Sequence, residues 1–243
     1  MKQQRTIVIP HEHGGWAMVS VPFLLGMMAG SPNYMHALLF VAWLCLYLSS
    51  YPFLQAVKRS ANRSYYIQWG IGYGIVGLIC LIPSLLYSPE LFFFGIPLVL
   101  LLLVNIWHAK AKSERAIVND LCAIMIFAIG GAAAYILGDG TWDHKMGMIV
   151  LFSFIYFTGT ALFVKSVFRE KNNVRWHGYS RIYHIVMLIV PFVAGYPLMA
   201  LAYAFAIVRA LLLAGKSIRP MKVGIIEIVG VVLFLIFSVV ALS

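Results

Sequence analysis

Charge is scarce in this 243-residue sequence, and negative charge is the scarcest: eight Asp and Glu residues stand against eighteen Lys and Arg residues. Charged residues make up 11% of the chain and hydrophobic residues 62%. A soluble domain of this size has too little interior to hide so much apolar surface, whereas a bilayer solvates it. The composition therefore excludes an ordinary soluble domain and predicts an integral membrane protein.

Motifs of disulfide-bonded, haem-binding and secreted proteins are also missing. Cys45, Cys80 and Cys122 each stand alone in an apolar run, without a CxxC or CxxCH pattern. They are typical of small hydrophobic residues in helices, so neither a disulfide framework nor covalent haem attachment is indicated. The first apolar run follows a charged start but is continued by eight more, which predicts an uncleaved first helix rather than a signal peptide.

Apolar runs alternate with short polar breaks along the whole length. Turn-type clusters such as Ser31-Pro32-Asn33 and Gly138-Asp139-Gly140 mark several of the breaks. Nine helices of about 20 residues need roughly 180 residues, so we expect a single all-α membrane domain over residues 1–243. The predicted spans are about 14–30, 35–56, 65–87, 91–108, 117–138, 146–165, 180–195, 197–214 and 223–242.

Seventeen of the eighteen basic residues fall on one side of this nine-span arrangement, and Lys145 alone lies opposite. The positive-inside rule then predicts a multi-pass membrane protein with the N-terminus in the cytoplasm and the C-terminus outside. The seventh and eighth spans are short. Fusing them into one would move Arg209, Lys216, Arg219 and Lys222 outside, so the charge rule favours two helices.

The net charge of +10 raises the question of nucleic-acid binding. The basic residues are spread over several short loops instead of forming one arm or stripe, so we expect no nucleic-acid partner. Anionic lipid headgroups, or an anionic substrate at the cytoplasmic surface, suit this distribution better.

The densest polar cluster is His11, Glu12 and His13, directly before the first span. Residues two apart on a helix point in different directions, so the two histidines do not form an HExxH-type metal site, and we expect no metal. Two interpretations stay open. The segment is either an interfacial helix start, with Trp16 in the aromatic belt, or part of a catalytic or headgroup-binding site.

A second polar stretch precedes and enters the fifth span. Asp120 lies just inside the membrane end of this span, where a carboxylate is costly unless it is paired, bound or near water. It is therefore a candidate acid or base, although the favourable dipole of a helix N-terminus explains it equally well. The other polar members are Asn105, His108, Lys112, Glu114, Arg115 and Asn119.

Two basic pairs close even-numbered spans, Lys58 with Arg59 and Lys165 with Arg169. Together they predict an anion-binding pocket at the cytoplasmic side. Each pair alone is also explained as ordinary topogenic charge, with the side chains extending to the interface.

Arg209 and Glu227 lie about one turn inside the membrane on adjacent spans, at similar depth. Either charge alone would be costly there, so we expect a structural ion pair. His184 is a possible third member of this group.

Several segments identify the chain as resembling the YwiC-like family of bacterial membrane proteins. They are PHEHGGWAM at 10–18 with VPFLLG at 21–26, YPFLQAVKR at 51–59, ERAIVNDLCAI at 114–124, ALFVKSVFRE at 161–170 and MKVGIIEI at 221–228. The resemblance covers essentially the whole chain. It implies the topology of a multi-pass protein and a place in the bacterial cytoplasmic membrane, but it assigns no activity.

A more distant similarity is to the UbiA superfamily of intramembrane prenyltransferases, and it implies a UbiA-like bundle. In that superfamily, Asp-rich motifs at the ends of spans two and six hold magnesium and a prenyl diphosphate. The corresponding segments here, SYPFLQAVKRSANR and FVKSVFREKNN, contain no Asp. Magnesium requires hard carboxylate oxygens, so the departure argues against magnesium-dependent ionisation, and we expect no cofactor.

Three functions fit the sequence. The first is a UbiA-like enzyme, metal-independent or divergent, or a lipid-binding relative, with a pocket between spans one, two, five and six for an anionic isoprenoid, quinone-type molecule or phospholipid. The second is a small transporter with Glu227, Arg209 and His184 as a relay. The third is an accessory subunit of a respiratory or biogenesis complex.

Overall fold

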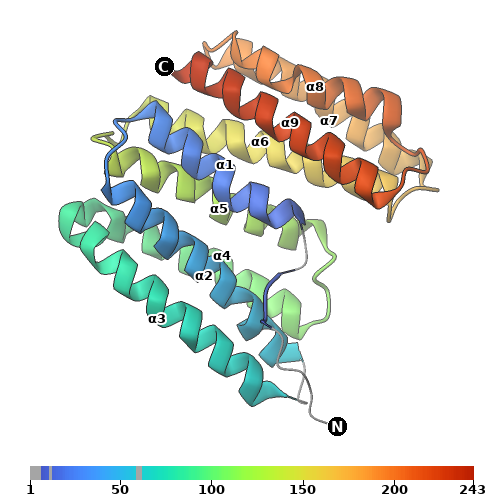
Figure 1. Cartoon of the computed structure of the whole chain (residues 1–243). Coiled ribbons are helices and arrows are strands. Elements are labelled where there is room, and N and C mark those ends of the chain that lie inside the picture. Colours follow the sequence, from blue (N-terminus) through green and yellow to red (C-terminus); the bar gives the residue numbers. More distant parts are fainter. Residues whose placement is uncertain (1–6, 11–12, 59–61) are drawn as a thin grey trace.

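The structure is a computed structural model that describes residues 7–10, 13–58 and 62–243. Within these ranges the chain forms α-helices and one short 3-10 helix, with no strand (Figure 1). The elements are α1 (His13–Ala29), α2 (Met35–Lys58), α3 (Arg63–Tyr87), η1 (Pro89–Phe94), α4 (Gly95–Lys110), α5 (Ile117–Leu137), α6 (His144–Val167), α7 (Val174–Val193), α8 (Met199–Leu213) and α9 (Pro220–Leu242).

The described α-helices follow the predicted spans in number and order, and most ends differ by only one to three residues. The start of α7 differs most: the helix begins at Val174, whereas the apolar run begins near residue 180. Asn173 caps the helix by accepting a hydrogen bond from the Trp176 amide at 3.3 Å. A capped polar turn therefore precedes the apolar part of α7, and hydropathy alone does not reveal it.

Helices long and apolar enough to cross a membrane are found at six places in the described chain, by length and composition. They are α2, α3, the η1–α4 unit, α5, α6 and α9. The apolar helices α1 and α8 are shorter, and α7 is more polar at its start. A multi-pass membrane protein follows from this composition.

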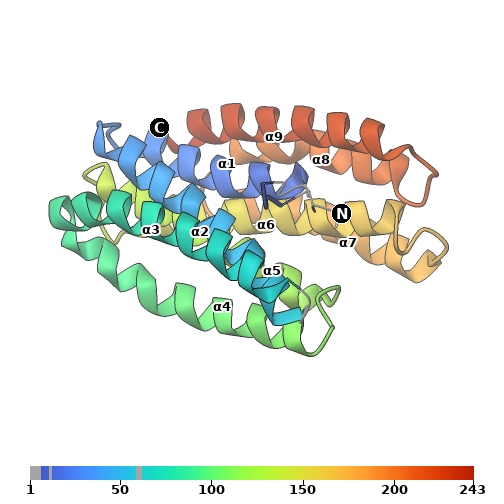
Figure 2. The same ribbon diagram turned by 60° about the horizontal axis from the view of Figure 1, so that its bottom comes forward.

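Helices α1 and α5 occupy the middle of the bundle. They lie between α2, α3 and α4 on one side and α6 to α9 on the other, in both views (Figures 1 and 2). The helix α5 packs against α1, α4 and α6, and about half of its most apolar stretch is buried. In contrast, α3 and α4 expose long rows of Leu, Ile and Val side chains, as expected for surfaces that face lipid.

Small residues on α5 allow its neighbours to approach closely. A Cβ atom added at Gly26 of α1 would overlap the carbonyl oxygen of Gly131, so the two backbones are in direct contact. The indole of Trp43 on α2 lies over Gly130 and donates a hydrogen bond to the Val19 carbonyl at 3.1 Å. Close backbone contact through small residues is a common way to pack helices in membranes.

At one end of the bundle, hydrogen bonds join the loop between α1 and α2 to the end of α5, and α2 to α5. The Ser31 amide donates to the Gly138 carbonyl at 2.7 Å, and the buried His36 ring contacts the Ala134 carbonyl at 2.9 Å. Asp143 caps α6 by accepting from the Met146 amide, and this bond is the main reason why the pKa of its carboxyl is lowered. We call this end the acidic end, because Glu90, Asp139 and Asp143 lie there.

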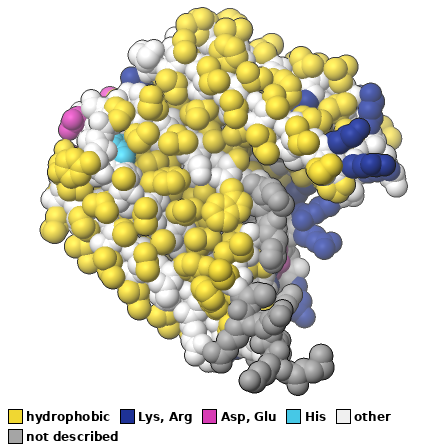
Figure 3. Space-filling view, viewed as in Figure 1, with side chains coloured by type: hydrophobic (Ala, Val, Ile, Leu, Met, Phe, Trp, Pro, Cys, Tyr) yellow, Lys and Arg dark blue, Asp and Glu magenta, His cyan; other side chains and the backbone are white. Residues whose placement is uncertain are grey.

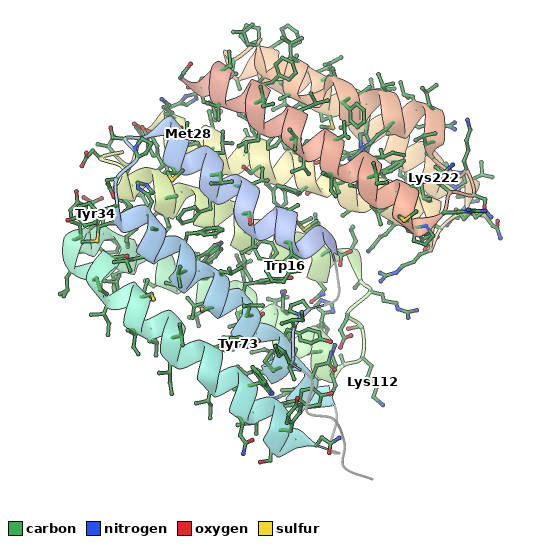
Figure 4. The ribbon with its side chains drawn as sticks, in the orientation of Figure 1. Trp16, Met28, Tyr34, Tyr73, Lys112 and Lys222 are labelled. Atoms are coloured by element: carbon green, nitrogen blue, oxygen red, sulfur yellow. The ribbon has the colours of Figure 1, made fainter. Side chains whose placement is uncertain are left out.

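The opposite end carries the basic residues. Every Lys and Arg in the described ranges except Lys145 belongs to a loop at this end or to the nearer half of a helix that reaches it. Figure 3 shows most of the visible dark blue side chains along one edge of a largely hydrophobic surface. In Figure 4, Lys112 and Lys222 lie at this basic end, whereas Met28 and Tyr34 lie at the acidic end.

The contact between α1 and α5 generates a stability prediction. We expect Gly26→Ala to lower the free energy of unfolding by about 1–3 kcal/mol, because the added methyl group forces the two backbones apart. Thermal unfolding of the detergent-purified protein measures the effect. Gly14→Ala on the same helix is the control, because its added methyl group meets nothing within 4 Å. Equal melting temperatures for the two variants would contradict the close contact.

Candidate functional site

A large cavity runs from the basic end along one side of α5. Its volume is about 2530 Å³, and α1, α2, α4, α5, α6 and α9 supply most of its lining. The sequence predicted a pocket between spans one, two, five and six, and the cavity also involves α4 and α9. This volume exceeds the roughly 300–1,000 Å³ of ordinary small-molecule pockets.

The cavity lining is apolar over most of its length and polar at the basic end. Exposed apolar residues of α4, including Ile96, Val99 and Leu100, belong to the lining, so the cavity is open toward the surface that faces lipid. Near the basic end the lining contains charged side chains from five segments, namely Lys58, Glu114, Arg115, Asp120, Lys165 and Arg169. We call this part the mouth of the cavity.

Two ion pairs connect the segments around the mouth. Lys58 at the end of α2 lies 2.6 Å from Glu114, which belongs to the linker 111–116 between α4 and α5. Lys165 in the last turn of α6 lies 2.5 Å from Asp120 in the first turn of α5. Both lysines that were predicted to hold an anion thus have a carboxylate partner within the protein.

The two lysines differ in their surroundings. The side chain of Lys165 is 10% exposed, and its ammonium group also donates to the Arg115 carbonyl at 3.0 Å. The side chain of Lys58 is 27% exposed, and Glu114 is its partner among the described residues. Lys165 therefore connects α6 to α5 and to the linker 111–116, whereas Lys58 forms a single, partly hydrated ion pair.

Positive charge remains in excess at the mouth. Four basic residues face two carboxylates there, and the exposed side chains of Arg115 and Arg169 belong to no ion pair among the described residues. Arg169 lies two residues beyond the end of α6, in the turn that leads to α7. It was predicted one helical turn after Lys165, and its amide does bond to the Lys165 carbonyl at 3.0 Å.

Two amide side chains add hydrogen-bonding capacity to the lining. Asn105 of α4 and Asn119 of α5 both line the cavity. Asn119 donates to the Glu114 carbonyl at 3.0 Å, but the side-chain oxygen atoms of both residues are buried and accept no hydrogen bond from the described part of the chain. Buried polar atoms are normally paired, so these two oxygens are available to a donor.

Arg209 and Glu227 form an ion pair between α8 and α9, with Glu227 in the cavity lining and Arg209 behind it. The Arg209 guanidinium also donates to Thr160 at 2.9 Å and lies over the Phe163 ring, 4.9 Å from its centroid. Arg209 is 2% exposed, so its charge is compensated entirely within the bundle. Glu227 and Thr160 contribute to the cavity lining, which links this buried pair to the site.

His184 does not join this pair through any described hydrogen bond. Its ring bonds to the Ser180 carbonyl at 2.7 Å, one turn earlier in α7, and its other nitrogen packs near Gly159. His184 is thus not connected to Arg209 or Glu227 by a described hydrogen bond.

Some candidate residues lie outside the described part of the chain. This applies to His11, Glu12, Arg59 and the side chain of His13, so their proposed roles stay predictions. Pro10, Gly14 and Gly15 do line the cavity, which brings the flanks of that segment to the mouth.

Sequence reasoning gave Glu114 no role of its own and did not select Thr160. A signal for Glu114 was available, because it lies in a short loop among the basic residues Lys110, Lys112 and Arg115. A carboxylate in a basic loop is a natural partner for a neighbouring lysine. No comparable signal exists for Thr160, whose role depends on the packing of α6 against α8.

The fold and the cavity define a class: a polytopic α-helical membrane protein with a large, mainly apolar cavity and a charged mouth. The chain belongs to the YwiC-like family, because a family profile described as "YwiC-like protein" matches residues 9–135 and full-length relatives agree. An uncharacterised protein of Haemophilus influenzae is 35% identical over 235 residues, which cover 97% of this chain and 98% of the relative. The uncharacterised protein YwiC of Bacillus subtilis is 36% identical over 228 residues, covering 94% and 95%.

The predicted family is therefore confirmed. No solved structure shows a significant match to the chain. The similarity to UbiA prenyltransferases accordingly stays a prediction.

The buried ion pair between α8 and α9 yields a second stability prediction. Arg209→Leu leaves the Glu227 carboxylate buried without its partner, which we expect to cost about 3–5 kcal/mol of unfolding free energy. The double variant Arg209→Leu/Glu227→Leu removes both charges and should unfold closer to the wild type. Thermal unfolding in detergent compares the three proteins, and a double variant no more stable than the single variant would contradict the pairing.

Proposed function

We propose that this protein binds a lipid with an anionic headgroup in the cavity along α5. The headgroup lies at the mouth, near Lys58, Lys165 and Arg169, and the chains extend between α2, α4 and α5. The observation that carries the proposal is the combination of a large apolar lining with an excess of positive charge at one end. An amphipathic molecule with a negative head matches both features.

The lateral opening supports a ligand that comes from the membrane. Exposed apolar residues of α4 lie in the cavity wall, so a lipid can enter from the bilayer without passing through water. The unpaired amide oxygens of Asn105 and Asn119 suit a headgroup or linkage that carries hydrogen-bond donors. A phospholipid and a polyprenyl phosphate share the required chemistry, and binding experiments distinguish them.

We also propose that all nine helices cross the bacterial cytoplasmic membrane, with the basic end and the N-terminus in the cytoplasm. The separation of charge between the two ends of the bundle supports this orientation through the positive-inside rule. The mouth of the cavity then opens toward the cytoplasm.

An enzymatic role would require residues that perform chemistry on the bound lipid. Asp120 is the described candidate for an acid or base, and its pairing with Lys165 suits a positioning role better than proton transfer. The histidine cluster before α1 is the remaining candidate for chemistry on a bound lipid. The UbiA-like interpretation therefore rests on those histidines and on the place of the basic pairs.

Lipid binding is testable by native mass spectrometry of the detergent-purified protein. We expect phosphatidic acid to bind about tenfold more tightly than phosphatidylcholine with the same acyl chains, which corresponds to one charge-assisted hydrogen bond. A polyprenyl monophosphate is the parallel probe for an isoprenoid ligand. Equal affinities for anionic and zwitterionic lipids would refute the proposal.

Arg169→Gln locates the site of binding. We expect this variant to bind phosphatidic acid roughly three- to tenfold more weakly, because an exposed cation at the mouth is lost. Arg175→Gln is the matched control: it removes the same charge from an exposed residue at the same end, outside the cavity lining. An equal loss in both variants would indicate attraction to the basic surface as a whole.

The orientation predicts which residues react with a membrane-impermeant maleimide. In a background with Cys45, Cys80 and Cys122 replaced by Ala, we expect labelling of Lys145→Cys, Pro197→Cys and Ser243→Cys in spheroplasts. Lys112→Cys should react only after permeabilisation. Protection of Pro197→Cys would show that α7 and α8 do not both cross, and labelling of Lys112→Cys from outside would reverse the orientation.

A further inference from the structure

Glu114 forms an ion pair with Lys58, one of the basic residues proposed to bind the lipid headgroup. Its carboxylate lies 2.6 Å from the Lys58 ammonium, and both side chains belong to the lining at the mouth. A negatively charged headgroup that binds Lys58 must therefore exchange with Glu114 or share the lysine with it.

The backbone around Glu114 is held in place independently of its side chain. Asn119 donates to the Glu114 carbonyl at 3.0 Å, and Lys165 donates to the Arg115 carbonyl at 3.0 Å. Neither bond involves the Glu114 carboxylate. The carboxylate can consequently leave Lys58 by side-chain rotation while the linker stays fixed.

Replacing the carboxylate partner of Lys58 by a headgroup costs less free energy than replacing that of Lys165. The Glu114 side chain is 38% exposed, so its carboxylate regains water when it moves away, and partly exposed ion pairs are weak. Asp120 is attached to α5, and its partner Lys165 is 10% exposed with a second bond to the linker. Breaking that pair would leave a charge largely removed from water.

We propose that Glu114 is a tethered counter-ion, which holds Lys58 while the mouth is empty and is displaced by the anionic headgroup of the bound lipid. This inference rests on the proposed lipid-binding function. Glu114 sets the affinity of the site for the lipid. Because its carboxylate competes for Lys58, the free energy gained when the anionic headgroup binds is smaller, and the lipid is released more readily. Lys165 and Asp120 stay paired throughout and position the walls of the mouth.

Glu114→Gln tests the inference, because the amide keeps the shape of the side chain and removes its charge. In native mass spectrometry with phosphatidic acid, we expect this variant to bind roughly two- to fivefold more tightly than the wild type. The factor corresponds to the small free energy of a partly exposed ion pair, which the headgroup no longer has to displace. Binding of phosphatidylcholine should not change. Glu114→Ala gives a second measurement in the same direction.

Glu170→Gln is the matched control for net charge. Glu170 lies at the same end, outside the cavity lining, and bonds to Asn173. An unchanged affinity in Glu170→Gln beside a raised affinity in Glu114→Gln supports exchange at Lys58. Equal gains in both variants, or weaker binding by Glu114→Gln, would overturn the inference. If the wild type itself does not prefer phosphatidic acid, the proposed function fails instead.

Discussion

The interior of a bilayer does not solvate charge, and the arrangement of this chain follows from that constraint. Basic side chains gather at one end of the bundle, where headgroups and water are in reach. The charged pair that lies deeper, Arg209 with Glu227, is compensated across two helices and supported by Thr160. The same constraint explains why the mouth of the cavity combines cations with carboxylates instead of presenting cations alone.

The surroundings of α5 change along its length. Toward the acidic end, small residues of α5 let α1 and α2 come into close contact, through Gly26 on Gly131 and Trp43 on Gly130. Toward the basic end, the cavity is lined by polar and charged side chains, including Asn119 and Asp120 of α5. The cavity therefore joins a mainly apolar wall to the end of the bundle where the basic residues lie.

The charged residues of the mouth therefore have two functions in one place. Lys165 links α5, α6 and the linker between α4 and α5, so it contributes to the structure of the wall. Lys58, Arg115 and Arg169 supply charge that is hydrated or easily exchanged. Under the proposed function, a site of this kind attracts an anionic group without leaving buried charge uncompensated when it is empty, because each cation either has a carboxylate partner or is exposed to solvent.

The sequence by itself determined the helices, their order and the family, because hydrophobic runs, turn clusters and extended motifs are local features. It also determined which loops are basic, and hence at which end a charged site would lie. Only the tertiary structure decided that Lys58 meets Glu114 and Lys165 meets Asp120. The tertiary structure also added α4 and α9 to the wall of the cavity. Those pairings join residues 45 or more positions apart, and they depend on how helices pack sideways, which hydropathy and charge along the chain do not encode.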